Sequence, residues 1–380
     1  MKEEVCISGD AGQGDKENII YRDKLFNWQI ISKNRNILFG ISILWIILLH
    51  TTNYPVIDKW QGFREHSLLF SLYNLIDLGG AGVDIFLFLS GIGLYYSFSK
   101  CTDLKKFYVK RFKRVLIPYL IWGTGYWFIR DIIYAQNPNG FLEDLFWVTY
   151  YTDGVSTYWY ISFILVMYLL FPLFYYMLES RHRNLNLVLL LALSIGLIAV
   201  MYNGNLELYL HIEKSVARIP VFILGCYWGR IVKSAKPMSE GWVIYALIIP
   251  WIGGILQYTD ELGIVPWKIT SRLWYGLLAI AICILFSMIF AVVRLERIRK
   301  FLNMAGTLSL ELYLIHIALQ RLMKLWYPDY ESWSMAKNCI MYLLVVVIAS
   351  FITANVYHYL SKKLTEKMKL CTTIRKRPFI

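Results

Sequence analysis

Two ionisable side chains, His50 and Asp84, interrupt segments that are otherwise almost entirely apolar. His50 ends the run ILWIILLH, and Asp84 lies within GAGVDIFLFLSG. A carboxylate in such a segment costs free energy unless it is paired or lines a wet cavity. If Asp84 accepts a hydrogen bond from one imidazole nitrogen of His50, the other nitrogen becomes the general base that a hydroxyl group requires. The alternative is a His–Asp bridge that only joins two helices.

The composition indicates the elements that must position these groups. The chain of 380 residues is 57% hydrophobic and 17% aromatic, with a mean hydropathy of +0.47, which is typical of an all-α integral membrane protein. Apolar runs of about 20 residues predict ten spanning helices. They cover residues 36–53, 80–99, 115–130, 157–178, 184–202, 216–232, 241–258, 272–292, 304–322 and 338–361.

The placement of the basic residues predicts the orientation of these helices. Most of the 39 Lys and Arg residues fall in the N-terminal segment, the C-terminal segment and every second connection. The positive-inside rule then predicts that both termini are cytoplasmic, in a multi-pass protein of the plasma or inner membrane. This distribution accounts for the net charge of +13 without nucleic-acid binding.

Three regions follow from these patterns. Residues 1–35 are polar and predict a disordered cytoplasmic arm, residues 36–361 form the membrane domain, and residues 362–380 form a basic cytoplasmic tail. The six cysteines have no metal-ligand spacing, and no metal site is predicted.

The predicted topology places several polar residues at one depth. His50 ends an outward helix and Asp84 begins an inward one, so both lie about one turn below the outer surface. Trp159 and Arg218 begin helices at the same face, which makes a polar outer pocket plausible, although aromatic residues there also form the ordinary interfacial belt. Tyr313 and His316 lie in the ninth helix, where His316 lines the pocket or is a hydrogen-bonded packing residue.

The basic stretch KKFYVKRFKRVLIPY lies at the predicted cytoplasmic face. Arg111 and Arg114 are three residues apart at a helix entry, so their guanidinium groups face one way and can clamp a phosphate group. The alternative is an anchor that binds lipid head groups.

The order of these motifs resembles that of the membrane-bound acyltransferase family 3. The similar elements are GISILWIILLH with His50, GVDIFLFLSG with Asp84 and Ser90, FYVKRFKRVLIPY, YWYISFILVMYLLFP with Trp159, ARIPVFILGCYWG with Arg218, and SLELYLIH with His316. The resemblance implies a ten-helix protein that moves an acyl group, usually acetyl, from cytoplasmic acyl-coenzyme A to a hydroxyl of a cell-surface or exported glycan. It also implies that His50 is catalytic and that Arg111 and Arg114 contact the coenzyme.

One position departs from the family pattern. The family usually has an arginine eleven residues before the histidine, and Phe39 stands there in this chain. Arg35 lies one turn deeper on the same helix face. Helical side chains lean toward the N-terminus, so Arg35 would have to reach against that lean to replace the missing arginine.

The sequence therefore predicts an integral-membrane O-acyltransferase. His50, oriented by Asp84, either deprotonates the acceptor hydroxyl or carries the acyl group itself. Arg35, Arg111 and Arg114 bind the coenzyme, and Ser90, Trp159, Arg218, Tyr313 and His316 line the substrate pocket. The alternatives are a transporter of a lipid-linked sugar and an inactive relative that binds a partner.

Overall fold

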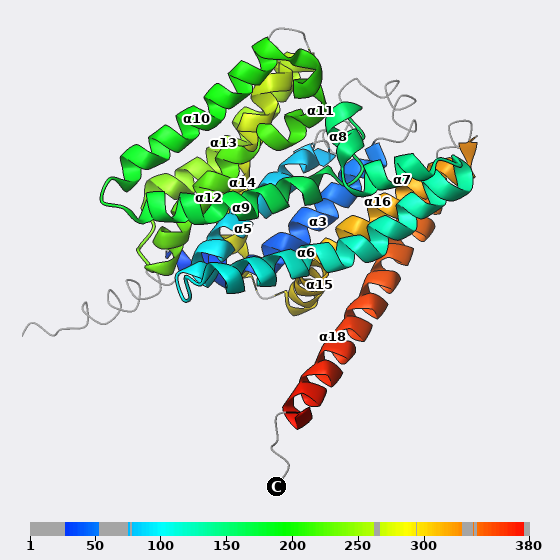
Figure 1. Cartoon of the computed structure of the whole chain (residues 1–380). Helices are drawn as coiled ribbons and strands as arrows, with labels where there is room; N and C mark the ends of the chain where they lie inside the picture. Colours follow the sequence, from blue (N-terminus) through cyan, green and yellow to red (C-terminus); the bar gives the residue numbers. More distant parts are fainter. Residues whose placement is uncertain are drawn as a thin grey trace, which may run out of the picture.

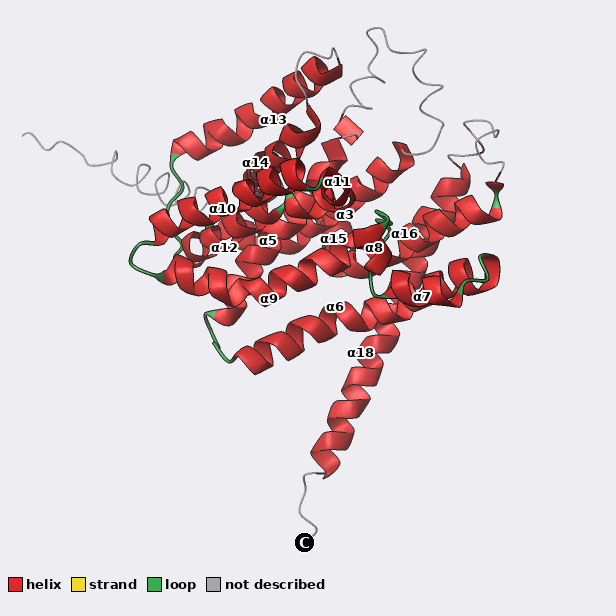
Figure 2. Ribbon diagram, turned by 45° about the horizontal axis from the view of Figure 1, so that its top comes forward, coloured by secondary structure: helices red, strands yellow, loops and turns green. Residues whose placement is uncertain are grey.

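The protein is a bundle of α-helices in a computed structural model (Figure 1). The structure describes residues 27–52, 75–76, 78–261, 267–293, 295–328, 337 and 340–375. Within these ranges the chain forms helices, turns and one isolated bridge between Asn27 and Pro237, with no strand (Figure 2).

The longer helices follow the apolar runs of the sequence. They are α3 (Arg35–Thr52), α5 (Ala81–Phe98), α6 (Leu104–Trp127), α9 (Trp159–Glu179), α10 (Arg183–Gly204), α12 (Ile219–Lys233), α13 (Glu240–Glu261), α14 (Trp267–Val292), α16 (Ser309–Trp326) and α18 (Ala349–Arg375). Shorter elements connect them: α2 (Gln29–Lys33), η2 (Leu78–Gly80), η3 (Phe128–Tyr134), α7 (Pro138–Leu145), α8 (Val148–Thr152), α11 (Leu206–Val216), α15 (Glu296–Thr307) and η5 (Tyr342–Ile348).

Each of the ten predicted spans lies on one or more of these helices. Six helices of the described residues are long and apolar enough to cross a membrane, and a seventh span results if α15 and α16 are counted together. The multi-pass all-α prediction is therefore confirmed, whereas the number ten and the cytoplasmic termini stay predictions. The ninth predicted span differs most, because α15 and α16 meet at a 73° bend.

The predicted N-terminal arm contains more structure than its composition suggested. Residues 1–26 lie outside the described residues, but α2 packs into the bundle through buried Trp28, Ile30 and Ile31. Trp28 also lies edge-on to Trp228 and Trp242, so α2 is part of the packed bundle, while the domain division at residue 35 stays a prediction. At the other terminus, α18 continues from the last apolar run into the basic segment and projects away from the bundle (Figure 1).

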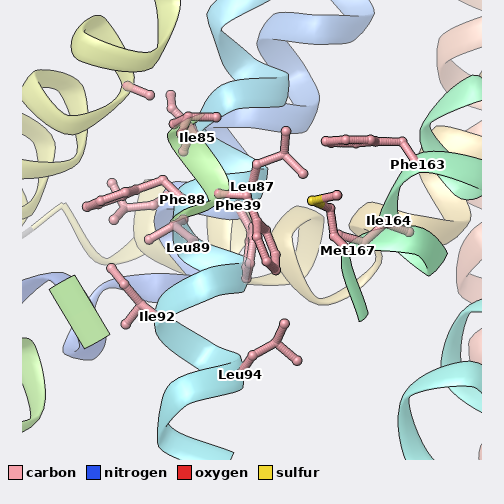
Figure 3. Packing of buried hydrophobic residues seen from close by; sticks show 14 of the residues in the cluster. Phe39, Ile85, Leu87, Phe88, Leu89, Ile92, Leu94, Phe163, Ile164 and Met167 are labelled. Atoms are coloured by element: carbon pink, nitrogen blue, oxygen red, sulfur yellow. The ribbon is translucent and has the colours of Figure 1, made fainter. Parts of the chain in front are cut away.

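Helix α5 is the central element of the core. Its apolar residues pack against α9 residues Phe163, Ile164 and Met167, with Phe39 of α3 beside them (Figure 3). On another side α5 packs closely on α12, because glycines face each other there. A Cβ atom on Gly225 would lie 2.3 Å from the Phe88 carbonyl oxygen, and one on Gly91 would lie 2.6 Å from the Cys226 nitrogen. Such small residues let helix backbones approach in a membrane, where no hydrophobic force drives their association.

The bend between α15 and α16 places the start of α16 beside α3. Gly306 lies against the α3 backbone so closely that any Cβ atom would overlap the Asn36 carbonyl group. The first turn of α16 is thereby held next to the start of α3, where it helps to form a cavity.

Candidate functional site

Two of the cavities in the described part of the chain contain the predicted site residues, and we name them inner and outer according to the predicted orientation. The inner cavity has a volume of about 220 Å³. Its polar lining includes three arginines, Arg35, Arg111 and Arg114, and Ser90 of α5, with no Asp or Glu among the described lining residues. The inner cavity is therefore strongly cationic.

The outer cavity is larger, at about 440 Å³. His50 lies in its wall, together with Trp159 at the start of α9 and Arg218 at the start of α12. The structure thus brings three of the predicted outer residues into one site.

The two cavities adjoin, because Ile46, Tyr160 and Tyr313 line both of them. The rings of Tyr160 and Tyr313 meet edge to face with centroids 5.5 Å apart. These two side chains lie between the two cavities, and we call the pair of adjoining cavities from Arg111 and Arg114 to His50 the passage.

One face of α16 follows this whole passage. Residues spaced three and four apart share a helix face, and the lining residues of α16 have that spacing. Their order along the helix is Ser309, Leu310, Tyr313, Ile317, Gln320, Arg321 and Lys324. His316 lies next to this face and is fully buried.

His50 has a histidine as its partner. Its Nδ1 lies 2.9 Å from Nε2 of His316, and the two rings stack with centroids 5.2 Å apart. The other nitrogen of His316, Nδ1, lies 2.6 Å from the carbonyl oxygen of Leu312. Three groups therefore form one hydrogen-bonded chain that ends at the outer cavity.

This chain defines the tautomers of two neutral imidazoles. A carbonyl oxygen only accepts hydrogen bonds, so Nδ1 of His316 carries the hydrogen. Nε2 of His316 is then an acceptor, and Nδ1–H of His50 donates to it. The lone pair of His50 therefore remains on its other ring nitrogen, Nε2. A general base needs this arrangement.

The end of α3 is held in place by two side chains. The last carbonyl groups of a helix have no partner within the helix. His50 is one of the residues at this end, and Gln320 donates to its carbonyl oxygen at 3.0 Å. One turn earlier, Tyr342 donates to the carbonyl oxygen of Ile47 at 3.0 Å. The backbone of His50 is therefore attached to α16 and η5 beside its side chain.

The predicted pairing of Asp84 with His50 is wrong. Asp84 accepts from Nε of Arg218 at 3.1 Å, and both side chains are almost fully buried. Arg218 also donates to the carbonyl oxygens of Lys214 and Gly80 and lies over the Trp159 ring at 5.3 Å. The ion pair thus connects the outer ends of α5, α9, α11 and α12. Asp84 is a positioning residue of the cavity wall, and His316 takes the place beside His50.

The inner arginines come from two helices. Asp103 caps α6 by accepting from the Lys106 backbone N–H at 3.0 Å, and this hydrogen bond lowers the pKa of the Asp103 carboxyl group. The cap starts α6 ahead of the predicted span, so Arg111 and Arg114 lie on its second and third turns. Nε of Arg111 is buried and has no partner within the described part of the chain. A buried donor without a partner is costly unless a ligand satisfies it.

Arg35 lies beside Phe39, the residue that stands where the family pattern has an arginine. Its guanidinium group lies over the Phe39 ring, 4.8 Å from the centroid, and lines the inner cavity with Arg111 and Arg114. Residues four apart share a helix face, and the cation–π contact holds the two side chains together. Nε of Arg35 is also buried without a partner among the described residues.

Several lining residues were not singled out from the sequence. They are Lys214, Gln320, Arg321 and Lys324. The last three share a helix face with Tyr313, and this spacing after SLELYLIH was the signal that could have identified them.

The fold and the passage define a multi-pass membrane protein with a buried site. The family model described as an acyltransferase domain matches residues 36–355, so the chain belongs to the acyltransferase 3 family. No curated protein and no solved structure matches the chain. The family match spans α3 to α18, and therefore includes both cavities.

The buried ion pair leads to a prediction about stability. Asp84→Ala should destabilise the protein by about 3 to 5 kcal/mol, because it leaves the Arg218 charge buried without its carboxylate. The double variant D84A/R218M should be more stable than D84A, since neither charge then remains. Thermal unfolding of the purified proteins in detergent measures this order. A double variant that is less stable than D84A would contradict the assigned pair.

Proposed function

We propose that this protein is an O-acyltransferase that moves an acyl group, most plausibly acetyl, from cytoplasmic acyl-coenzyme A to a hydroxyl group in the outer cavity. The observation that carries the proposal is the chain Leu312–His316–His50, which presents an available Nε2 at a passage between two cavities. The acceptor that we propose is a hydroxyl of a cell-surface or exported glycan.

The inner cavity fits the phosphate end of the donor. Arg35, Arg111 and Arg114 line it, and its described lining residues include no Asp or Glu, so an anion bound there would relieve their mutual repulsion. Two of these guanidinium groups keep a buried donor atom available. The first turn of α16 also lines this cavity, and a helix N-terminus favours negative charge.

The passage accounts for the distance between the donor charge and the reacting atoms. His50 follows Arg35 by fifteen residues of α3, which is about 22 Å at 1.5 Å per residue. A long thioester arm is needed to span this distance, and the pantetheine arm of coenzyme A is such a group. The arm would pass between Tyr160 and Tyr313, the residues shared by both cavities.

The chemistry follows from the tautomer of His50. Nε2 accepts the proton of the acceptor hydroxyl while its oxygen attacks the thioester carbonyl carbon. The carbon–sulfur bond breaks, and the imidazolium returns the proton to the thiolate, so protons and charges balance. In the alternative order, Nε2 takes the acyl group first and the hydroxyl attacks the acyl-imidazole. In both mechanisms, His316 orients the His50 ring through its hydrogen bond with Nδ1 of His50.

The hydrogen-bonded chain predicts unequal effects of its two histidines. His50→Ala should lower kcat by about 10²- to 10⁴-fold, the usual contribution of a general base. His316→Ala should lower kcat less and leave the KM values of donor and acceptor nearly unchanged. It removes the hydrogen bond that orients His50, but His50 itself remains. Transfer of radiolabelled acetyl from acetyl-coenzyme A by purified protein measures these constants.

His182→Ala is a matched control, since His182 is exposed between α9 and α10. Its constants should equal those of the wild type. Near-wild-type transfer by a folded H50A protein would contradict the catalytic assignment, and movement of a glycan without acyl transfer would favour a transporter.

The positions of Arg111 and Arg114 in the inner cavity lead to a prediction about the affinity for coenzyme A. Replacing Arg111 and Arg114 together with Gln should weaken coenzyme A binding by roughly a hundredfold or more, because each charge-assisted hydrogen bond contributes about 1.5 to 3 kcal/mol. Calorimetric titration of detergent-solubilised protein with coenzyme A measures the difference. The variant K105Q/K113Q removes two charges from the same helix without touching the cavity and should bind like the wild type. Equal affinities of all three proteins would leave the arginines as lipid or topology anchors.

A further inference from the structure

The hydroxyl group of Tyr313 is a buried polar group that neither the fold nor the proposed base uses. Among the described residues, three buried hydroxyl groups have no hydrogen-bond acceptor, those of Ser287, Tyr313 and Ser350. Of these three residues, Tyr313 is the one that lines both the inner and the outer cavity. A buried donor without an acceptor costs free energy, so its presence needs an explanation, and a bound ligand supplies one.

The oxygen of this hydroxyl group faces the start of α9. The backbone N–H of Tyr160, the second residue of α9, approaches it, and α9 has no side-chain cap at its N-terminus. The first N–H groups of a helix have no partner within the helix and favour negative charge. An N–H group that points at a hydroxyl oxygen also strengthens that hydroxyl as a donor. Tyr313 is therefore a polarised donor beside the positive end of a helix.

Tyr313 lies at the level where the proposed reaction requires the thioester carbonyl group. Its ring contacts that of His316, the partner of His50, with centroids 6.1 Å apart. Ile46 lines both cavities as Tyr313 does, and His50 follows Ile46 by four residues of α3, about 6 Å at 1.5 Å per residue. A base lies roughly 3 Å from the oxygen that it activates, and that oxygen lies roughly 3 Å from the carbon that it attacks. With Nε2 of His50 as the base, the carbonyl carbon therefore falls where the two cavities adjoin.

We propose that Tyr313 is a catalytic residue that donates a hydrogen bond to the carbonyl oxygen of the donor thioester. The inference rests on the proposed acyl transfer and adds a catalytic group to the same site. When the acceptor oxygen bonds to the carbonyl carbon, an electron pair moves onto the carbonyl oxygen, and the Tyr313 O–H stabilises that negative charge. When the pair returns, the carbon–sulfur bond breaks and the thiolate takes the proton from His50. The Tyr313 proton stays on its own oxygen throughout.

The variant Tyr313→Phe removes only the hydroxyl group and tests this role. Turnover of acetyl-coenzyme A by the purified full-length protein is measured as thiol release, with water as the acceptor. We expect kcat to fall by about 10²- to 10³-fold, the effect of losing one such donor, while KM for acetyl-coenzyme A stays nearly unchanged. The melting temperature should change little, because the hydroxyl hydrogen has no acceptor to lose. A packing role would lower stability instead.

A second readout measures the binding of a tetrahedral group. The trifluoroketone analogue of acetyl-coenzyme A carries a CH₂–CO–CF₃ group on its sulfur and hydrates to a tetrahedral form, whereas the matching methyl ketone stays planar. The wild type should bind the trifluoroketone at least about tenfold more tightly than the methyl ketone, and Tyr313→Phe should lose this preference. Both proteins should bind coenzyme A alike in calorimetric titration.

Tyr245→Phe is the matched control for the loss of a hydroxyl group. The Tyr245 hydroxyl donates to the Leu277 carbonyl oxygen at 2.7 Å, and Tyr245 is not among the lining residues of either cavity. This variant should keep the wild-type kcat and the preference for the trifluoroketone, and it should melt at a lower temperature because it loses a hydrogen bond. Wild-type kcat in Tyr313→Phe would overturn the inference. A Tyr313→Phe protein that fails to fold, or that binds coenzyme A more weakly in proportion to its lower turnover, would also overturn it.

The outcome is separable from the proposed function. If the wild type binds and consumes acetyl-coenzyme A and Tyr313→Phe does so equally well, only the role of Tyr313 is wrong. If the wild type binds the coenzyme without hydrolysing it, the preference for the trifluoroketone decides alone. If the wild type neither binds nor consumes the coenzyme, the acyltransferase proposal itself fails, and the role of Tyr313 fails with it.

Discussion

A buried ionisable group inside an apolar bundle needs a partner, and this requirement determines how the site of this protein is arranged. His50 pairs with His316, and Asp84 pairs with Arg218, so two independent sets of polar contacts share the outer end of the bundle. The first set defines the tautomer of His50. The second set joins helices whose residues form the cavity wall. Because Asp84 pairs with Arg218, its carboxylate does not contact the imidazole of His50.

Among the described residues, the lining of the inner cavity contains three arginines and no Asp or Glu, so the three positive charges repel one another. The close approach at Gly306 holds α15 against α3, the helix that carries Arg35. Stored repulsion of this type is relieved when an anion binds, which connects the fold to the proposed substrates.

Much of the architecture could be predicted from the sequence, because apolar runs and their length report directly on membrane helices. Each of the ten predicted runs coincides with one or more helices over its described residues, and the arginines of α6 line one cavity as their three-residue spacing indicated. The pairing of His50 could not be predicted. The sequence predicts how deep in the membrane a residue lies, but it does not predict toward which neighbouring helix its side chain points. Asp84 and His316 were therefore both possible partners of His50. The bend at Leu308 also changed the level of His316. Gly306 and Ser309 flank it in MAGTLSL, and they were the signal that could have indicated the bend.

The central claim is that one passage connects the inner arginines to Nε2 of His50. An electron cryomicroscopy structure of the protein with a non-hydrolysable acetyl-coenzyme A analogue tests it most directly. The account predicts phosphate density against Arg35, Arg111 and Arg114, an arm between Tyr160 and Tyr313, and the acyl carbon within reach of His50 Nε2. Density for the acyl group that ends outside this passage, or phosphates bound away from the three arginines, would contradict it.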